Sequence, residues 1–425
     1  MRPSRIDWDG TDPARLAASL RGLTTTEPVT GGVREILERV RAGGDAALRE
    51  QAERFGEPAP ESLRVDPEAV AAAPGLLDPE VRDALRLAAA NIEAVARAEL
   101  EGLARPSLAE LPQGQRVEVR SEAVAAAGVY APGGKAPYPS SVLMCCIPAR
   151  VAGVARIALA SPPGVGGRPQ APVLAAAALA GVGEVYAAGG AQAIAALAYG
   201  TESVPSVDVI VGPGNRYVTE AKRLVFGHVG IDGLAGPSEL LVVADASADA
   251  RAVALDVLAQ AEHGDDSPLV VVSPEPGLLD RVGELVSELA PDRPSVAEAP
   301  LALVASPGLE VALGLADAFA PEHLELAFAG ADENAARSRV AGCVFVGPGG
   351  ATAFGDYAAG SNHVLPTGGA ARFGRPLGPW AFMRRISVVS MSAPAAGALA
   401  PAVTTLAEAE GFPVHGESAR GRTSP

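Results

Sequence analysis

The stretch Gln260-Ala261-Glu262-His263-Gly264-Asp265-Asp266-Ser267 closes a predicted helix with a cluster of polar groups. Residues 248–263 carry apolar side chains among alanines, as a buried helix does, and Gly264 is placed to end that helix. Apolar runs over 238–244 and 269–272 predict a strand on each side of it. A strand, a helix and a strand in this order predict a right-handed βαβ unit, and therefore an α/β fold with a parallel sheet.

Gln260 and His263 are three residues apart in this helix, so they share one face of its last turn. Both side chains could reach a single ion, which makes the pair a candidate metal site. The alternative is that they hydrogen-bond the last carbonyl groups of the helix, where the helix dipole favours a protonated histidine. Two ligands do not make a zinc site, so the choice depends on ligands elsewhere in the chain.

Composition excludes several classes of protein. With 425 residues, of which 48% are hydrophobic, the chain can build the cores of two or more domains. Its net charge of −16 argues against nucleic acid or an anionic membrane as a partner. Glycines break the alanine-rich stretches and no apolar signal segment is visible, so we expect no membrane span. Three cysteines suit a reducing cytoplasm, and we expect the adjacent Cys145 and Cys146 to be buried small residues.

Strand-like runs recur after residue 122, and each is followed by a turn rich in glycine or proline. The runs cover residues 124–130, 157–160, 185–188 and 207–211. With helical stretches between them, they predict a doubly wound parallel sheet, in which ligands lie at the carboxyl ends of the strands. The turn Gly189-Gly190 could hold a phosphate at a helix N-terminus, although the fingerprint GxGxxG is missing. The run Gly133-Gly134-Lys135-Ala136 lacks the residues of a P-loop.

Two later segments hold further candidates for chemistry. Glu322 and His323 precede an alternating, strand-like run and form an acid/base pair by residue type, although a solvated loop histidine is the alternative. Segment 355–367 is rich in glycine and polar residues, which is typical of a functional loop. Within it, Asp356 is a possible third metal ligand, and we expect His363 to anchor the loop.

Seven motifs, in one order along nearly the whole chain, resemble those of the histidinol dehydrogenase family. They are 128–134 (GVYAPGG), 189–197 (GGAQAIAAL), 212–215 (GPGN), 235–239 (AGPSE), 260–264 (QAEHG), 321–325 (PEHLE) and 355–367 (GDYAAGSNHVLPT). The resemblance implies zinc- and NAD-dependent oxidation of L-histidinol to L-histidine through L-histidinaldehyde, the last step of histidine biosynthesis. It also implies two Rossmann-like doubly wound domains with an incomplete nucleotide fingerprint, plus small N- and C-terminal segments.

The resemblance further implies a role for each motif residue. The implied zinc ligands are Gln260, His263, Asp356 and His415. His323 takes the hydroxyl proton as hydride leaves for NAD⁺, and Glu322 activates the water that adds to the aldehyde. The implied substrate contacts are Ser238, Gln260, His263, His323, Asp356, Glu410 and His415. The implied NAD contacts are Tyr130, Gln192 and Asn215.

By the same resemblance the protein is an intertwined homodimer, in which Glu410 and His415 of one chain complete the site of the other. The implied domains are a helical segment 1–26, a metal-binding α/β domain of 27–129 and 239–377, an inserted α/β domain 130–238 on the NAD side, and a C-terminal segment 378–425. Two alternatives remain at this point. One is a zinc hydrolase with Glu322 as the base, and the other is a non-catalytic metabolite-binding protein.

Overall fold

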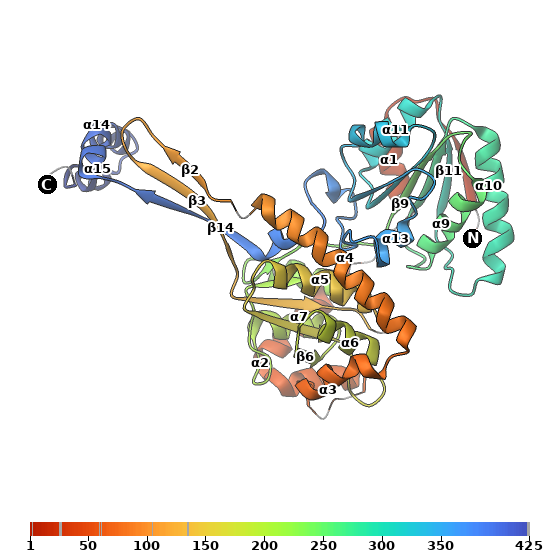
Figure 1. Cartoon of the computed structure of the whole chain (residues 1–425), viewed down its shortest axis with the longest axis horizontal. Coiled ribbons are helices and arrows are strands. Elements are labelled where there is room, and N and C mark those ends of the chain that lie inside the picture. The colour runs from red at the N-terminus through yellow and green to blue at the C-terminus, as the bar shows by residue number, and fades with distance from the viewer. Residues whose placement is uncertain are drawn as a thin grey trace.

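The chain folds into two α/β lobes and a long arm (Figure 1). The structure is a computed structural model, and it describes residues 1, 3–24, 28–58, 60, 62–103, 105–133 and 136–422. Gly134 and Lys135 of the rejected P-loop therefore lie outside the described residues. One lobe holds a six-stranded sheet, the other a five-stranded sheet, and the arm a three-stranded sheet. The expected pair of doubly wound α/β domains is confirmed.

The six-stranded sheet is parallel throughout, in the order β1-β11-β10-β9-β12-β13. Its strands are β1 (Pro3–Asp7), β9 (Leu240–Ala244), β10 (Leu269–Ser273), β11 (Leu301–Ala305), β12 (His323–Ala327) and β13 (Cys343–Val346). One face packs on α1 (Pro13–Arg21) and α11 (Leu309–Phe319), and the other on α9 (Ala250–Ala261) and α10 (Pro276–Leu289). Because both faces are buried, β9 and β10 are apolar at nearly every position. The predicted βαβ unit is β9-α9-β10.

The five-stranded sheet is also parallel, in the order β6-β5-β4-β7-β8. Its strands are β4 (Ala126–Tyr130), β5 (Arg156–Ser161), β6 (Glu184–Ala187), β7 (Val209–Val211) and β8 (Gly230–Ile231). The helices on one face are α3 (Pro67–Ala72), α4 (Pro79–Leu103), α5 (Pro139–Val151) and α6 (Ala171–Leu179). Those on the other face are α2 (Thr30–Arg54), α7 (Gly190–Tyr199) and α8 (Arg216–Val225).

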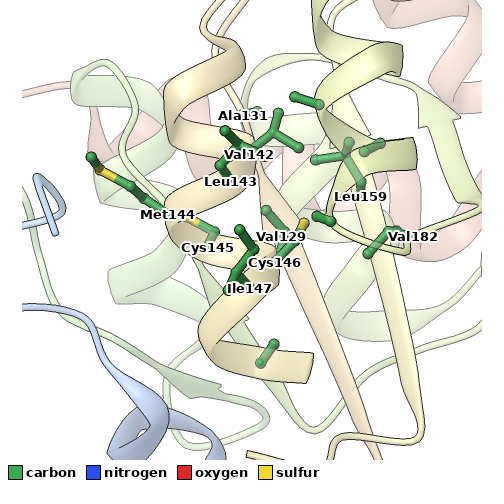
Figure 2. Close-up of a cluster of buried hydrophobic side chains, with 14 of the residues drawn as sticks. Val129, Ala131, Val142, Leu143, Met144, Cys145, Cys146, Ile147, Leu159 and Val182 are labelled. Atoms are coloured by element: carbon green, nitrogen blue, oxygen red, sulfur yellow. The ribbon is translucent and has the colours of Figure 1, made fainter. Parts of the chain in front are cut away.

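Helix α5 lies in the middle of one of these cores. Figure 2 shows its Val142, Cys146 and Ile147 beside Val129 and Leu159 of the sheet. Both Cys145 and Cys146 are fully buried. Burial raises the pKa of the Cys146 thiol to about 12 and that of Cys145 well above its usual value. The two cysteines are therefore buried small residues, as expected, and not nucleophiles.

The packing corrects the expected domain division. β1 pairs with β11, and α1 covers the same sheet, so the N-terminal residues belong to the six-stranded lobe and not to a separate helical segment. Helices α2, α3 and α4 pack on the five-stranded sheet, although the sequence grouped 27–129 with 239–377. The amphipathic pattern of a helix shows which face is buried, but the sheet that buries it is selected by tertiary contacts.

The arm is a three-stranded antiparallel sheet that ends in two helices (Figure 1). Its elements are β2 (Ser107–Glu110), β3 (Arg116–Ala123), β14 (Met383–Ser390), α14 (Ala393–Ala409) and α15 (Pro413–Arg420). The remaining short elements are η1 (Ala73–Leu76), η2 (Ala290–Asp292), α12 (Ala331–Asn334), η3 (Ala335–Arg337), α13 (Thr352–Tyr357), η4 (Ala370–Arg372) and η5 (Pro379–Phe382). Across the described ranges, every helix is too short or too polar to span a bilayer.

Gly212 directly follows β7, where that strand lies beside β4, and its conformation allows the two strand ends to meet. Its φ is +119°, and a Cβ atom there would lie 2.1 Å from the Tyr130 carbonyl oxygen. We expect Gly212→Ala to lower the free energy of unfolding by about 2–4 kcal/mol, measured by urea denaturation. Gly227→Ala is the matched control, because Gly227 has φ +99° and no atom within 4 Å of its Cβ position. Equal losses of unfolding free energy in the two variants would show that the clash with the Tyr130 carbonyl oxygen adds no cost.

Candidate active site

The candidate catalytic residues gather at the amino edge of the six-stranded sheet. Ser238 and Glu239 directly precede β9, Glu322 precedes β12, and His323 is the first residue of β12. Helix α9 runs back from the carboxyl edge, so its last turn brings Gln260 to the same place. The expectation that ligands lie at the carboxyl ends of strands therefore does not hold for these residues.

A chain of hydrogen bonds joins three of these side chains. The Glu322 Oε2 atom accepts hydrogen bonds from Ser238 Oγ at 2.6 Å and from the Glu239 backbone N–H at 2.8 Å. The Gln260 Nε2 atom donates to Ser238 Oγ at 2.6 Å. The other amide atom, Gln260 Oε1, is buried and has no hydrogen-bond partner in the described part of the chain. A buried oxygen without a partner is costly, so this atom is available to a ligand.

His323 is oriented by the backbone of Glu239. Its Nδ1 lies 3.0 Å from the Glu239 carbonyl oxygen, which can only accept, so Nδ1 carries the proton and donates it. The lone pair of the neutral ring is then on Nε2, which lies 3.7 Å from Asp356 Oδ1. Burial lowers the pKa of His323, but the Glu322 and Asp356 carboxylates outweigh it and raise this pKa well above its ordinary value.

Asp356 lies near the end of α13, so this part of the expected loop is helical. Its Oδ2 atom is 4.0 Å from His263 Nε2. Burial raises the pKa of Asp356, but the adjacent His323 outweighs burial and holds this pKa below its usual value. His363 fixes the backbone here, with Nδ1 3.0 Å from the Asp356 carbonyl oxygen and Nε2 2.9 Å from Ser141 Oγ of α5. The interpretation of His363 as an anchor is confirmed.

The donor types of Gln260, His263 and Asp356 fit a zinc ion. Zinc binds N and O ligands at about 2.1 Å, so two ligands of a tetrahedral ion lie roughly 3.4 Å apart. The His263 Nε2 and Asp356 Oδ2 atoms are 4.0 Å apart, so a small shift would bring both onto one ion, and the unpartnered Gln260 oxygen is a third atom of suitable type. Within the described residues, no three His, Cys, Asp or Glu side chains form a metal site.

Two predicted site residues are not brought to this place. Glu410 caps α14 and His415 lies in α15, at the tip of the arm (Figure 1). Both are exposed. The His415 ring contacts only its neighbour Phe412 among aromatic rings of the described chain, at a centroid distance of 5.5 Å. The site within one chain therefore lacks the fourth implied ligand.

The three predicted NAD contacts lie at the carboxyl edge of the five-stranded sheet. Tyr130 ends β4, and its hydroxyl accepts a hydrogen bond from the Gly190 N–H at 3.1 Å. Gln192 lies in the first turn of α7, and Asn215 caps α8 by accepting from the Tyr217 N–H at 3.0 Å. The strand order reverses between β4 and β7, where doubly wound sheets bind their ligands. Residues 232–239 connect this edge to the amino end of β9.

Comparison with known proteins decides the family. The family model for histidinol dehydrogenase matches residues 20–423. The chain belongs to the histidinol dehydrogenase family. It is 46% identical over 404 residues to a histidinol dehydrogenase of Parasynechococcus marenigrum, covering 93% of this chain and 91% of the relative. It is 44% identical over 433 residues to a histidinol dehydrogenase of Rhodospirillum rubrum, covering 99% of this chain and 98% of the relative.

The structure agrees with this assignment. The crystal structure of histidinol dehydrogenase from Elizabethkingia anophelis matches with a TM-score of 0.90 at 31% identity, covering 99% of this chain and 98% of that one. As a histidinol dehydrogenase family member, the chain is an NAD-dependent dehydrogenase. This result decides against the zinc-hydrolase and metabolite-binding alternatives.

One part of this histidinol dehydrogenase site was missed in the sequence. Arg21 of α1 forms an ion pair with Glu239, with Nη2 3.3 Å from Oε2, and its guanidinium lies 4.1 Å from the Phe319 ring centroid. Glu239 also accepts a hydrogen bond from the Gly368 N–H at 3.0 Å. Because the Glu239 backbone orients both Glu322 and His323, this ion pair positions them. Glu239 was within a quoted motif, but nothing in the sequence distinguishes Arg21 from the other arginines.

We expect Arg21→Met to lower the free energy of unfolding by about 1–3 kcal/mol, because it leaves the buried Glu239 carboxylate without its cation. Urea denaturation measures this loss. The matched control is Arg5→Met, which removes an exposed ion pair with Asp280 and should cost less than about 1 kcal/mol. A loss for Arg21→Met no larger than that of the control would contradict a structural role for the buried pair.

Proposed function

We propose that this chain oxidises L-histidinol to L-histidine through L-histidinaldehyde, with two NAD⁺ and one zinc ion per chain, as a cytoplasmic homodimer. The family assignment supports histidinol as the substrate. The observation that carries the chemistry is the hydrogen-bonded group of Gln260, Ser238 and Glu322, with its unpartnered amide oxygen, next to His323.

The proposed zinc ligands are Gln260, His263 and Asp356 of one chain and His415 of a second copy. When bound, the ion would act as a Lewis acid that orients the amine and imidazole nitrogens of the substrate. Ser238 lies within this group and is a proposed substrate contact. Glu410 is a proposed contact supplied by the second copy, because it lies near His415 in the arm.

His323 is the proposed base for the first oxidation. Its Nε2 would take the hydroxyl proton of histidinol. Bound NAD⁺ would supply the hydride acceptor for the carbon that carries this hydroxyl group. When the ring is neutral, the hydrogen bond from Nδ1 to the Glu239 carbonyl keeps the lone pair on Nε2. Glu322 is the proposed base for the second oxidation, in which it takes a proton from the water that adds to the aldehyde. Its Oε2 is held by two donors, which fixes the direction of the carboxylate.

Exposed apolar surfaces beside Asp356 and beside His415 support a zinc site that is shared between two copies of the chain. Large apolar side chains flank Asp356 on α13 and His415 on α15, and each is more than half exposed. They are Phe354 (59%), Tyr357 (64%), Phe412 (55%) and Val414 (69%). Neighbouring exposed apolar residues favour burial against another chain. Docking of α15 from a second copy onto α13 would cover both groups and complete the ligand set.

The NAD side is proposed at the carboxyl edge of the five-stranded sheet. The N-terminus of α7, next to Gln192, offers backbone N–H groups to a phosphate. The Asn215 side-chain oxygen is engaged as a helix cap, so its amide NH₂ is the group left for the nucleotide. The Tyr130 hydroxyl accepts the Gly190 N–H and keeps its own proton for donation.

The test is NADH formation, followed by absorbance, on adding L-histidinol to the zinc-loaded protein. We expect about two NADH per histidinol, and no NADH after zinc is removed by a chelator. His263→Ala should reduce bound zinc from about one per chain to near zero, because one of the few ligands is lost. His228→Ala, at an exposed histidine outside the site, is the control for zinc content. Full activity in zinc-free protein, or no NADH with histidinol, would contradict the proposal.

A further inference from the structure

Glu57 brings a carboxylate to the carboxyl edge of the five-stranded sheet, where the NAD side is proposed. The residue lies in the connection between α2 and α3. Its Oε1 atom is 2.8 Å from the position that a Cβ atom would take on Gly189, and the Cγ atom of Pro162 is 2.9 Å from the same position. Pro162 directly follows β5, and Gly189 caps α7 just after β6. The carboxylate therefore lies beside the carboxyl ends of two neighbouring strands.

Glu57 is also close to Tyr130, one of the proposed NAD contacts. Burial raises the pKa of Tyr130 to about 12, and the negative charge of Glu57 contributes to this rise. The Tyr130 hydroxyl accepts a hydrogen bond from the N–H of Gly190, the residue that follows Gly189. Tyr130, Gly189 and Glu57 therefore form one group at this edge of the sheet.

The Glu57 carboxylate is able to meet a ligand. Its side chain is only half-buried, so a ligand can reach it from solvent. Among the described residues, no hydrogen bond or ion pair involves this carboxylate, and burial alone raises its pKa. A carboxylate that has lost part of its hydration without gaining a donor is stabilised by a ligand group that donates to it.

The sequence of this lobe lacks the acidic residue that usually meets the ribose. In doubly wound dinucleotide domains, an Asp or Glu about 20 residues after the first strand-to-helix turn accepts a hydrogen bond from the ribose 2′-hydroxyl. The corresponding turn here follows β4, yet residues 123–183 contain no Asp or Glu. The whole β4-α5-β5 unit is therefore without this acid. Glu57 places a carboxylate beside Pro162, directly after the second strand of that unit.

We propose that Glu57 accepts a hydrogen bond from the 2′-hydroxyl of the adenosine ribose of NAD⁺ and excludes NADP⁺, which carries a phosphate at that position. This role rests on the proposed NAD side of the site. NAD⁺ and NADP⁺ have the same diphosphate, so Glu57 affects that group equally in both, and the 2′ position alone discriminates. A carboxylate beside a 2′-phosphate brings two negative charges together, which disfavours NADP⁺.

The experiment is isothermal titration calorimetry of the full-length, zinc-loaded protein with NAD⁺ and with NADP⁺, in the absence of histidinol. We expect the parent to bind NAD⁺ at least about tenfold more tightly than NADP⁺. Glu57→Gln should reduce this ratio of dissociation constants by about tenfold, because the charged acceptor and its repulsion of phosphate are both lost. Glu57→Arg should favour NADP⁺, because an arginine at this place accommodates the 2′-phosphate.

The matched control is Glu53→Gln, which removes the same charge from an exposed residue in the last turn of α2 and should keep the parental ratio within about twofold. Urea denaturation separates recognition from folding. Glu57→Gln should not lower the free energy of unfolding, because it breaks no contact of the carboxylate in the described chain.

A parental ratio in both Glu57→Gln and Glu57→Arg, or equal binding of the two dinucleotides by the parent, would overturn the proposal. NADH formation from histidinol is measured separately on the same variants. A chain that oxidises histidinol while its NAD⁺ to NADP⁺ ratio does not depend on Glu57 would overturn the role of Glu57 alone. A chain that binds NAD⁺ with the expected ratio but forms no NADH from histidinol would instead contradict the proposed reaction.

Discussion

Replacing His323 with asparagine should lower kcat for L-histidinol by about 10²–10⁴-fold, the usual contribution of a general base. The asparagine side chain can still donate to the Glu239 carbonyl, as Nδ1 does at 3.0 Å, so the local structure should be kept. What the variant lacks is the Nε2 lone pair that takes the hydroxyl proton. KM should change by less than about threefold, because a group needed mainly in the transition state affects kcat. Steady-state NADH formation measures both constants.

The control for this variant is His228→Asn. His228 is exposed and contacts the Tyr199 ring at a centroid distance of 5.1 Å, in the five-stranded lobe. Its replacement should leave kcat within about twofold of the parent, since exposed positions away from a site rarely matter. A kcat for His323→Asn within tenfold of the parent would remove His323 from the role of base.

Replacing His415 with alanine should abolish both zinc binding and activity, although His415 lies at the tip of the arm, away from the other ligands (Figure 1). If the ligand comes from a second copy, a heterodimer of His415→Ala and His323→Asn chains contains one intact site. That site combines His323 of the first chain with His415 of the second. We expect the purified heterodimer to recover about half of the parental activity, because one site of two is complete.

The controls are the homodimer of His415→Ala chains and the homodimer of His323→Asn chains. Each should be inactive by itself. A heterodimer prepared from parental and His415→Ala chains should also have about half of the activity, which shows that mixing itself causes no loss. Absence of recovery in the doubly substituted heterodimer, with normal activity in this control, would show that each chain completes its own site. The arm would then have to fold back onto its own lobe.

Much of the site could be predicted from local sequence. Gln260 lies in the last turn of α9 and His263 lies two residues after its end. A local turn, in which the His263 N–H donates to the Gln260 carbonyl at 3.2 Å, keeps both near the end of the helix. Glu322 and His323 are adjacent, so any fold that places one in the site also places the other nearby. The apolar runs of β9 and β10 predicted a buried parallel sheet, because strands covered on both faces are apolar throughout.

Other features depended on contacts between distant segments. The amino edge became the site because Ser238 and Glu322 precede neighbouring strands, and strand order is not visible in the sequence. The partner of Glu239 is Arg21, which lies 218 residues away along the chain. The hydrogen-bond direction of His323 likewise follows from the position of a backbone carbonyl, which no residue type predicts.

The sequence alone determined most strands of both parallel sheets, their buried character and the residue types available for a zinc ion and a base. These follow from periodicity and side-chain chemistry, which act over a few neighbouring residues. Only the tertiary structure decided which sheet each helix covers, which edge gathers the polar groups and how far His415 lies from them. Those outcomes depend on long-range packing, in which many pairings of similar apolar surfaces compete and geometry selects one.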